Sequence, residues 1–260
     1  IIQKNTNEAF AMNIPADSFL RGTPVAHRGY HCKGIPENSM AAFERAVSFG
    51  YAIETDVHLT KDGQIVVFHD DDLARMTGES GLVRDRTAAE LTQLHLGGTE
   101  ERIPLFSEFL GKVNGRVPLL IELKGDPNRA EFVAKVLAEL KDYKGEFALQ
   151  SFDPRILRQI KKQAPHILRG QLACKNSGQK SAFSRWVVRF MPMNFLNKPH
   201  FISYCSADLP YRRAKRRGAL LLCWTVRDED EYLRVKPLVD NVIFENIRPE
   251  QLYVTCGQHR

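Results

Sequence analysis

The chain has 260 residues, of which 43% are hydrophobic and 26% are charged. These proportions are ordinary for a globular protein. The length lets one large domain or two small ones bury a full core, so the fold does not need disulfide staples. The formal net charge of +6 indicates a mildly basic surface rather than a dedicated anion-binding face.

The cysteines are those of a protein from a reducing compartment. Their number is odd and no C-x-x-C pair occurs, so a secreted disulfide framework is not expected. No apolar run approaches the length of a membrane-spanning helix, and we expect a cytoplasmic protein. Because the chain begins at Ile1 rather than methionine, a removed signal peptide stays an alternative. The five cysteines are Cys32, Cys174, Cys205, Cys223 and Cys256.

The first third of the chain contains three short β-prone runs. The first is 25–27, after which Ser39 can cap a helix over 40–48. The other two, 52–57 and 64–68, are separated only by a Lys-Asp-Gly turn signal. Since no helix lies between these two runs, one of them is expected to form part of a hairpin arm outside a regular barrel.

Strands and helices then alternate to the end of the chain. Thr87 opens a short helix with a capping box, and the unbroken apolar run 117–123 is typical of a parallel strand buried on both faces. This alternation favours a parallel sheet, and nine strand-like segments fit an eight-stranded closed barrel with one extra arm, in a single domain over 1–260. The remaining predicted strands are 147–150, 168–173, 201–204, 219–224 and 241–244, and the remaining helices are 107–113, 129–143, 154–164, 209–217, 229–236 and 249–254.

Two segments differ in composition from the alternating strands and helices. Segment 181–197 is apolar, aromatic and basic, and it is interpreted either as a loop and helix packed on the barrel or as a lid that makes peripheral membrane contact. Pro192 interrupts any long amphipathic helix there, which favours the first interpretation.

The basic stretch 212–217 is interpreted as a solvated helix face or a surface for acidic headgroups. No stacking aromatics are interleaved with it, so nucleic-acid binding is not expected.

Three carboxylates lie at or near the ends of predicted strands. Glu54 and Asp56 are two residues apart on one strand, so their side chains share a face, and Glu122 lies near the end of another strand. Buried like charges this close repel one another and need a cation between them. Hard oxygen donors favour Mg²⁺ or Ca²⁺ over zinc, so these three residues are candidate ligands of one divalent cation.

Two histidines, His27 and His69, occupy equivalent strand ends. A lone histidine there is usually a core residue. A pair, however, can divide acid–base work, one removing a proton from the nucleophile and the other protonating the leaving oxygen. Arg28 and Lys124 add fixed positive charge suited to phosphate oxygens. Together with a metal, these residues meet the electrostatic requirement of phosphoryl transfer.

The same residues resemble a known family. The chain contains HRG, PEN, E-x-D-V-x-L-T-K-D-G, VVFHD, IELK and a late W-T-V, a set similar to that of the glycerophosphodiester phosphodiesterases. The resemblance is dense from His27 to Thr77 and continues through weaker landmarks to Val226. It implies a TIM-type (β/α)8 barrel with a small helical insertion at about 70–116. It also implies hydrolysis of glycerophosphodiesters to sn-glycerol 3-phosphate and an alcohol.

The resemblance further implies a role for each candidate residue. The general acid and base correspond to His27 and His69, and the ligands of the divalent cation correspond to Glu54, Asp56 and Glu122. The residues that bind phosphate or shape the substrate site correspond to Arg28, Lys124, Glu37, Asn38 and Trp224, with core packing as the alternative for Trp224. In the mechanism implied, the substrate's own 2-hydroxyl attacks phosphorus and water then opens a cyclic phosphate. Direct attack by water is the alternative.

The chain departs from the family pattern at one point, and two other functions compete with the one implied. After the last predicted strand, Glu245 replaces the family's shorter acidic pattern, which leaves open whether that loop contacts the metal ligands or the glycerol pocket. A lysophospholipase D, acting on lysophospholipids, is favoured only by segment 181–197. A non-catalytic phosphate- or lipid-binding barrel is disfavoured, because a decayed site would normally lack one of the two histidines or three carboxylates.

Overall fold

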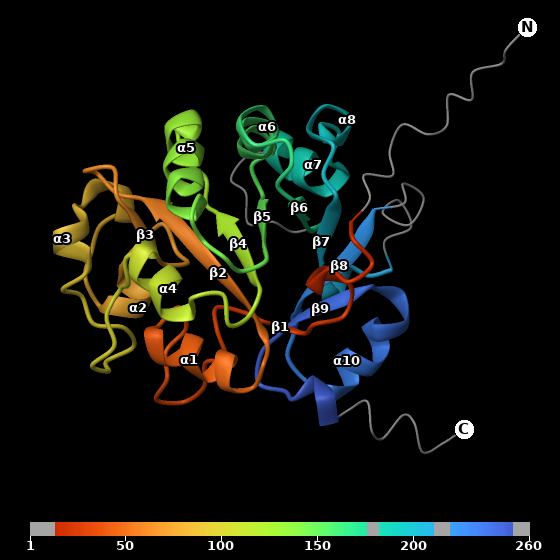
Figure 1. Ribbon diagram of the computed structural model, residues 1–260, viewed down its shortest axis with the longest axis horizontal. Coiled ribbons are helices and arrows are strands. Elements are labelled where there is room, and N and C mark those ends of the chain that lie inside the picture. The colour runs from red at the N-terminus through yellow and green to blue at the C-terminus, as the bar shows by residue number, and fades with distance from the viewer. Residues whose placement is uncertain (1–13, 176–181, 211–218, 252–260) are drawn as a thin grey trace, which may run out of the picture.

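The computed structural model describes residues 14–175, 182–210 and 219–251. One sheet contains nine strands: β1 (Val25–Ala26), β2 (Ala52–Leu59), β3 (Ile65–Val67), β4 (Leu119–Leu123), β5 (Phe147–Ser151), β6 (Arg169–Ala173), β7 (Phe201–Cys205), β8 (Leu220–Val226) and β9 (Asn241–Phe244). The order is β1-β9-β8-β7-β6-β5-β4-β2-β3, and β1 also pairs with β2. Eight parallel strands therefore close into a barrel, which confirms the predicted fold (Figure 1).

The ninth strand is the expected hairpin arm. β3 pairs antiparallel with the end of β2, with Val57 opposite Val67, and takes no place in the closed barrel. The turn at 61–63 reverses the chain too tightly for the helical crossover that a parallel neighbour requires.

Helices surround the barrel. They are α1 (Met40–Ser48), α2 (Ala74–Thr77), α3 (Ala88–Leu91), α4 (Phe106–Val113), α5 (Arg129–Leu140), α6 (Pro154–Gln163), α7 (Ala182–Phe190), α8 (Asn194–Asn197) and α10 (Glu229–Val235). Ser39 accepts a hydrogen bond from the Ala42 amide at the start of α1, and Thr87 forms the predicted capping box of α3. Of the predicted helix 249–254, residues 249–251 are helical and the rest lie outside the described residues. The predicted helix 209–217 falls mostly outside them, as do the basic stretch 212–217 and Cys256.

The stretch between β3 and β4 covers one side of the barrel. It contains α2, the 3-10 turn Val83–Asp85, α3 and α4, and α4 packs on α1 and β3. The stretch shares a small apolar cluster with β3 and has no strand of its own, which matches the helical character expected for 70–116. The cluster is Val66, Phe68, Leu73, Val83, Ala88, Leu91, Leu96 and Ile103.

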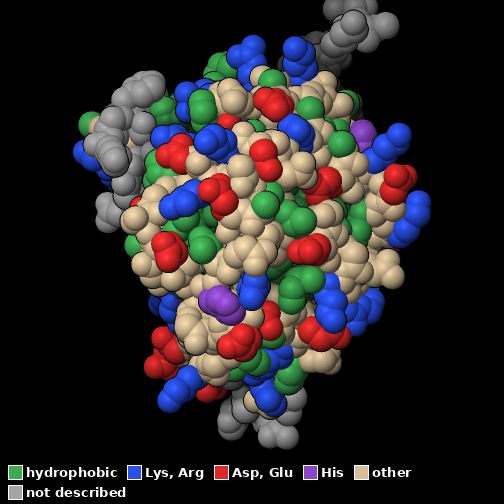
Figure 2. Space-filling view, turned by 90° about the vertical axis from the view of Figure 1, so that its left-hand side faces the viewer, with side chains coloured by type: hydrophobic (Ala, Val, Ile, Leu, Met, Phe, Trp, Pro, Cys, Tyr) green, Lys and Arg blue, Asp and Glu red, His purple; other side chains and the backbone are tan. Residues whose placement is uncertain are grey.

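Segment 181–197 is divided by its proline. α7 ends at Phe190, Met191 takes a left-handed φ of 48°, and α8 begins after Pro192. The interruption expected from Pro192 is confirmed. No helix among residues 14–175, 182–210 and 219–251 is long and apolar enough to cross a membrane. On the face shown in Figure 2, basic and acidic side chains are interspersed, as on an ordinary protein surface.

Candidate active site

The barrel interior changes from apolar to charged along two neighbouring strands. Ala52 and Leu120 point into the interior cluster, whereas Ile53 and Ile121 belong to the cluster between barrel and helices. Because side chains alternate along a strand, the next inward positions after Ala52 are Glu54 and Asp56. The same alternation on β4 turns Glu122 inward after Leu120. The carboxyl ends of β2 and β4 thus carry the charges, as expected for the face of such a barrel that holds active sites.

The strand register brings the three predicted metal ligands together. Asp56 on β2 is paired with Glu122 on β4, and Glu54 lies two residues before Asp56 on the same face. One carboxylate oxygen from each residue lies within 4.8 Å of the others, and all three residues are buried. Buried carboxylates this close are not expected unless a positive charge compensates them.

Lys124 supplies part of that compensation. Its Nζ lies 2.7 Å from Asp56 Oδ1 and 2.8 Å from Glu122 Oε1. Burial opposes ionisation of Asp56, but the charges of Lys124, His69 and Arg28 outweigh it and hold the pKa of this carboxyl well below its usual range. The lysine that sequence analysis placed on phosphate is therefore also an ion-pair partner of the carboxylates.

Glu54 and Glu122 are not fully compensated. Burial, followed by the charges of Asp56 and Glu122, raises the pKa of Glu54 well above its usual range. Burial also raises the pKa of Glu122, although Lys124 opposes the shift. Three carboxylates face two fixed cations, Arg28 and Lys124, so the cluster with all three acids ionised would carry a net negative charge, which a bound cation would neutralise. The donor set, three hard oxygens, fits Mg²⁺ or Ca²⁺.

His27 is held at the edge of this cluster by a residue from the far end of the chain. Its Nδ1 lies 2.5 Å from Glu245 Oε1, and its Nε2 lies 3.9 Å from Glu54 Oε2. Arg227 Nε donates to the second oxygen of Glu245 at 3.0 Å. Burial, which outweighs the hydrogen bond to the Glu245 carboxylate, lowers the pKa of His27 to about 4, so the imidazole is neutral near pH 7.

His69 has an equivalent but local partner. Its Nδ1 lies 2.5 Å from Oδ1 of Asp70, the next residue. Arg75 Nε donates to the other oxygen of Asp70 at 2.5 Å, and Arg75 Nη2 donates to Glu37 Oε1 at 2.6 Å. Both histidines thus present Nδ1 to a carboxylate that an arginine holds in place, which leaves Nε2 of each available to the site.

Arg28, Glu37 and Asn38 form a loop network that supports the carboxylates. The Arg28 amide donates to Glu54 Oε2 at 3.1 Å, and its Nη1 donates to Glu37 Oε1 at 2.8 Å. Asn38 Nδ2 donates to Asp56 Oδ2 at 3.0 Å. The chain turns sharply here: Arg28 and Gly29 take positive φ angles of 56° and 77°, and a Cβ on Gly29 would approach Ala42 to 2.9 Å. Only glycine fits that position.

A cleft of about 1220 Å³ opens beside the carboxylates. One wall carries His69, Glu122 and Lys124, and the other carries apolar side chains of Phe152 and of the α7–α8 segment, namely Trp186, Val187, Val188, Pro192 and Met193. Trp224 is not on this lining. It is half-buried, packs edge-on against Phe152 at 5.5 Å between ring centroids, and donates from Nε1 to the Ser203 carbonyl at 3.0 Å.

Four residues that complete the site had no role predicted from the sequence, although Glu245 among them was noted as a departure from the family pattern. Asp70 adjoins His69, and Glu245 directly follows β9, so an acid beside a strand end was an available signal for both. Arg75 and Arg227 had no such signal, because each meets its carboxylates only through the folded chain.

Comparison with known proteins agrees with this geometry. The model of the glycerophosphoryl diester phosphodiesterase family matches residues 27–248. A glycerophosphodiester phosphodiesterase of Caldanaerobacter subterraneus subsp. tengcongensis is 34% identical, covering 88% of this chain and 95% of its own length. A phosphodiesterase of Oleispira antarctica, solved with the product sn-glycerol-3-phosphate, superposes with a TM-score of 0.75 at 25% identity, covering 91% of this chain and 97% of its own.

A second solved structure, a glycerophosphodiester phosphodiesterase from Thermotoga maritima, has a TM-score of 0.66 at 26% identity, covering 92% of this chain and 99% of its own. The matched region spans every strand of the barrel from β2 to β9 and all the predicted site residues. The enzyme class expected from the sequence, a phosphoric diester hydrolase, is the class of this family. The chain belongs to the glycerophosphoryl diester phosphodiesterase family.

Proposed function

We propose that this enzyme hydrolyses glycerophosphodiesters to sn-glycerol 3-phosphate and an alcohol, with one divalent cation held by Glu54, Asp56 and Glu122. The observation that carries the proposal is the buried carboxylate cluster, with its oxygens within 4.8 Å and a histidine at each side. The Oleispira antarctica relative was solved with sn-glycerol-3-phosphate bound, which supports the choice of product.

The cation belongs to the proposal because the residues fit it. Mg²⁺ and Ca²⁺ both take carboxylate oxygens, and either would offset the burial and the like-charge repulsion that raise the pKa of Glu54. When bound, such an ion supplies charge stabilisation at phosphorus and makes a coordinated hydroxyl more acidic. Arg28 and Lys124 add fixed positive charge for the phosphate oxygens, while Glu37 and Asn38 hold Arg28 and Asp56 in place.

The two histidines divide the proton transfers. His27 is neutral near pH 7 and has Nε2 free of Glu245, so it accepts the proton of the attacking hydroxyl, either the substrate's 2-hydroxyl or water. His69, with Nδ1 held by Asp70, lines the open cleft and gives a proton to the departing alcohol oxygen. Trp224 supports the glycerol end indirectly, through Phe152.

Leaving-group substitution tests this division. The leaving group of a p-nitrophenyl ester, p-nitrophenolate, departs without protonation. His69→Ala should therefore keep much of its activity on that ester and lose about 100-fold or more on a choline ester. His27→Ala should lose activity on both esters alike. Equal losses for both variants on both esters would reject the assignment of roles.

The decisive test of the function is metal-dependent product release. Protein freed of metal with a chelator should form no glycerol 3-phosphate from a panel of headgroup esters, and Mg²⁺ or Ca²⁺ should restore the reaction. Turnover that persists in excess chelator would contradict the proposed carboxylate site.

A lysophospholipid substrate is the second candidate, and the apolar wall of the cleft favours it. Trp186, Val188 and Met193 face the same cavity as His69 and Lys124, which suits an acyl chain attached to the phosphodiester. Comparing glycerophosphocholine with lysophosphatidylcholine at equal metal separates the two. A higher kcat/KM on the acylated substrate would make the enzyme a lysophospholipase D.

Peripheral membrane contact through 181–197 is also proposed. It is supported by three exposed side chains in that segment, Trp186, Phe195 and Leu196. The single-domain organisation over 1–260 and a cytoplasmic location stay predictions from the sequence.

A further inference from the structure

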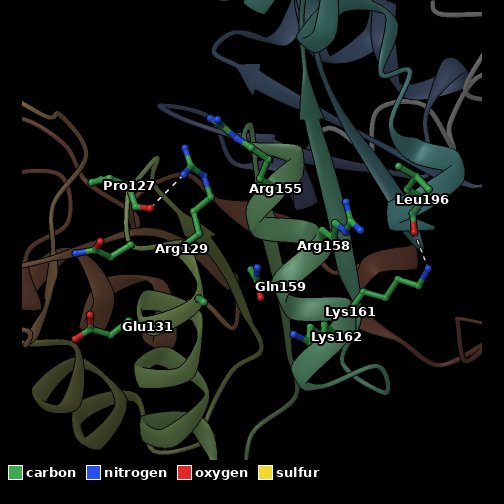
Figure 3. Close-up of a pocket in the computed structure, with 11 residues that line it drawn as sticks. Pro127, Arg129, Glu131, Arg155, Arg158, Gln159, Lys161, Lys162 and Leu196 are labelled. Carbon is green, nitrogen blue, oxygen red and sulfur yellow. Dashed lines mark hydrogen bonds between the residues drawn. The ribbon is translucent and has the colours of Figure 1, made fainter.

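A basic groove lies on the flank of the barrel, outside the active site. It has a volume of about 1030 Å³ and runs between the start of α5 and the outer face of α6 (Figure 3). Four cations line it at helical spacing along α6: Arg155, Arg158, Lys161 and Lys162. Leu196 of α8 closes one side, where Lys161 Nζ donates to its carbonyl at 2.6 Å.

Most of this charge is not neutralised. Asp153 pairs with Arg129 and Arg155, and Glu131 is the one carboxylate in the lining. Within the described residues, Arg158 and Lys162 have no carboxylate partner, and both are exposed. Burial, and then the like charges of Lys198, Arg169 and Arg158, lower the pKa of Lys161, as expected in a field of excess cations.

Exposed apolar side chains lie on α7 and α8, where Leu196 lines this groove and Trp186 lines the catalytic cleft. Trp186 is 48% exposed, Phe195 63% and Leu196 39%, which makes them three of the five large hydrophobic side chains that are exposed among the described residues. Arg185 and Arg189 accompany Trp186 on the exposed side of α7. A short amphipathic segment with aromatic and aliphatic tips flanked by cations is the pattern of a protein surface that rests in a lipid–water interface.

We propose that the outer face of α6 together with α7 and α8 docks on an anionic phospholipid bilayer. Phe195 and Leu196 enter the headgroup region, and Arg158 and Lys162 contact lipid phosphates. Arg129 and Arg155 line both the groove and the catalytic cleft, so docking sets the mouth of the cleft beside the bilayer. The inference deepens the proposed function by naming its partner surface, and vesicle binding can be measured without turnover.

Vesicle sedimentation tests the proposal. The full chain should sediment with phosphatidylcholine vesicles containing phosphatidylglycerol and bind phosphatidylcholine alone more weakly. Arg158→Glu with Lys162→Glu should weaken binding to the anionic vesicles by at least ~10-fold. The matched control, Arg102→Glu with Lys112→Glu, changes the net charge equally on the insertion and α4, away from α6–α8, and should bind as the unmodified protein does.

A second pair isolates the apolar contribution. Phe195→Ser should weaken binding several-fold, whereas Leu233→Ser, which removes an exposed leucine from α10, should not. All four variants should hydrolyse soluble glycerophosphocholine at the unmodified rate, so a failure of docking is distinguishable from a failure of catalysis.

Three outcomes would overturn the inference. They are the absence of vesicle binding by the unmodified protein, equal losses in the α6 variant and its matched control, and binding of a short DNA duplex instead of vesicles through the same two cations.

Discussion

The inward side chains of strands β2 and β4 change from aliphatic to carboxylate along each strand, so the amino and carboxyl ends of the barrel interior are stabilised differently. Ala52 and Leu120, which precede the carboxylates on their own strands, are fully buried, and Glu54 and Asp56 are buried to the same degree. Burying apolar area stabilises a fold by roughly 25 cal/mol per Å². Burying carboxylates costs free energy unless cations and hydrogen bonds compensate it. The amino end therefore supplies stability, and the carboxyl end holds a charge cluster whose benefit lies in binding and catalysis.

The largest effect is expected from a substitution among the carboxylates at the carboxyl end of the barrel. Glu54→Gln should lower kcat/KM by about 1000-fold, because it removes a proposed metal ligand. Since burial and like charges raise the pKa of Glu54, its ionised form is disfavoured in the fold, and the neutral variant without metal should melt no lower than the parent. Metal titration with a kinetic assay, paired with calorimetry after chelation, measures both. Full activity in this variant, or a lower melting temperature, would contradict this interpretation.

The opposite pattern is expected at the amino end. Leu120→Ala should destabilise the protein by about 3 kcal/mol, from the lost transfer free energy and the cavity left behind. The activity of the folded fraction should fall less than in Glu54→Gln, because Leu120 carries no ligand atom, although it is the register partner of Glu54 on β2. Denaturant unfolding and active-site titration separate the two quantities. A large loss of kcat at unchanged stability would show that the two ends are not independent.

A smaller effect should come from the support of His27. Glu245→Gln keeps the size of the side chain but removes the charge beside His27 Nδ1, and kcat should fall by about 10- to 100-fold with KM nearly unchanged. Arg227→Lys, which retains a cation near Glu245, serves as the milder control. If the glutamine variant matched the parent while His27→Ala was inactive, Glu245 would have no part in positioning the histidine.

The smallest expected effect is on the pH dependence of the unfolding free energy, through a histidine at the amino end of the barrel. Burial, with a contribution from Arg169, lowers the pKa of His200 to about 4, and its Nδ1 accepts a hydrogen bond from the Arg169 amide at 3.1 Å. The folded pKa lies below the unfolded value, so this contribution is complete above about pH 6.5 and is lost as the pH falls toward about 4. Unfolding free energies should drop by about 1–2 kcal/mol more between about pH 7 and pH 5 in the parent than in His200→Gln. Equal slopes would exclude His200 as a source of acid sensitivity.

Local sequence patterns predicted much of this structure because their physics is local. Alternation along a strand placed Glu54 and Asp56 on one face, and a turn signal identified the β2–β3 hairpin. Capping residues predicted the start of α1 and of α3. Pro192 predicted the break between α7 and α8. Each of these depends on residues within a few positions of one another, which the chain order itself specifies.

The tertiary structure decided which distant residues share an environment. His27 meets Glu245 across 218 positions, and Arg75 reaches Glu37 across 38, pairings that arise only when the barrel closes. Strand pairing also set Lys124 between two carboxylates. Helix packing put Leu196 beside Lys161, so α6 and α8, which are separate in the sequence, form one surface. Strand propensity and side-chain alternation were therefore readable from the chain alone. The ion pairs and the basic groove depended on strand register and helix packing, because long-range electrostatic contacts are specified by distances in space and not along the sequence.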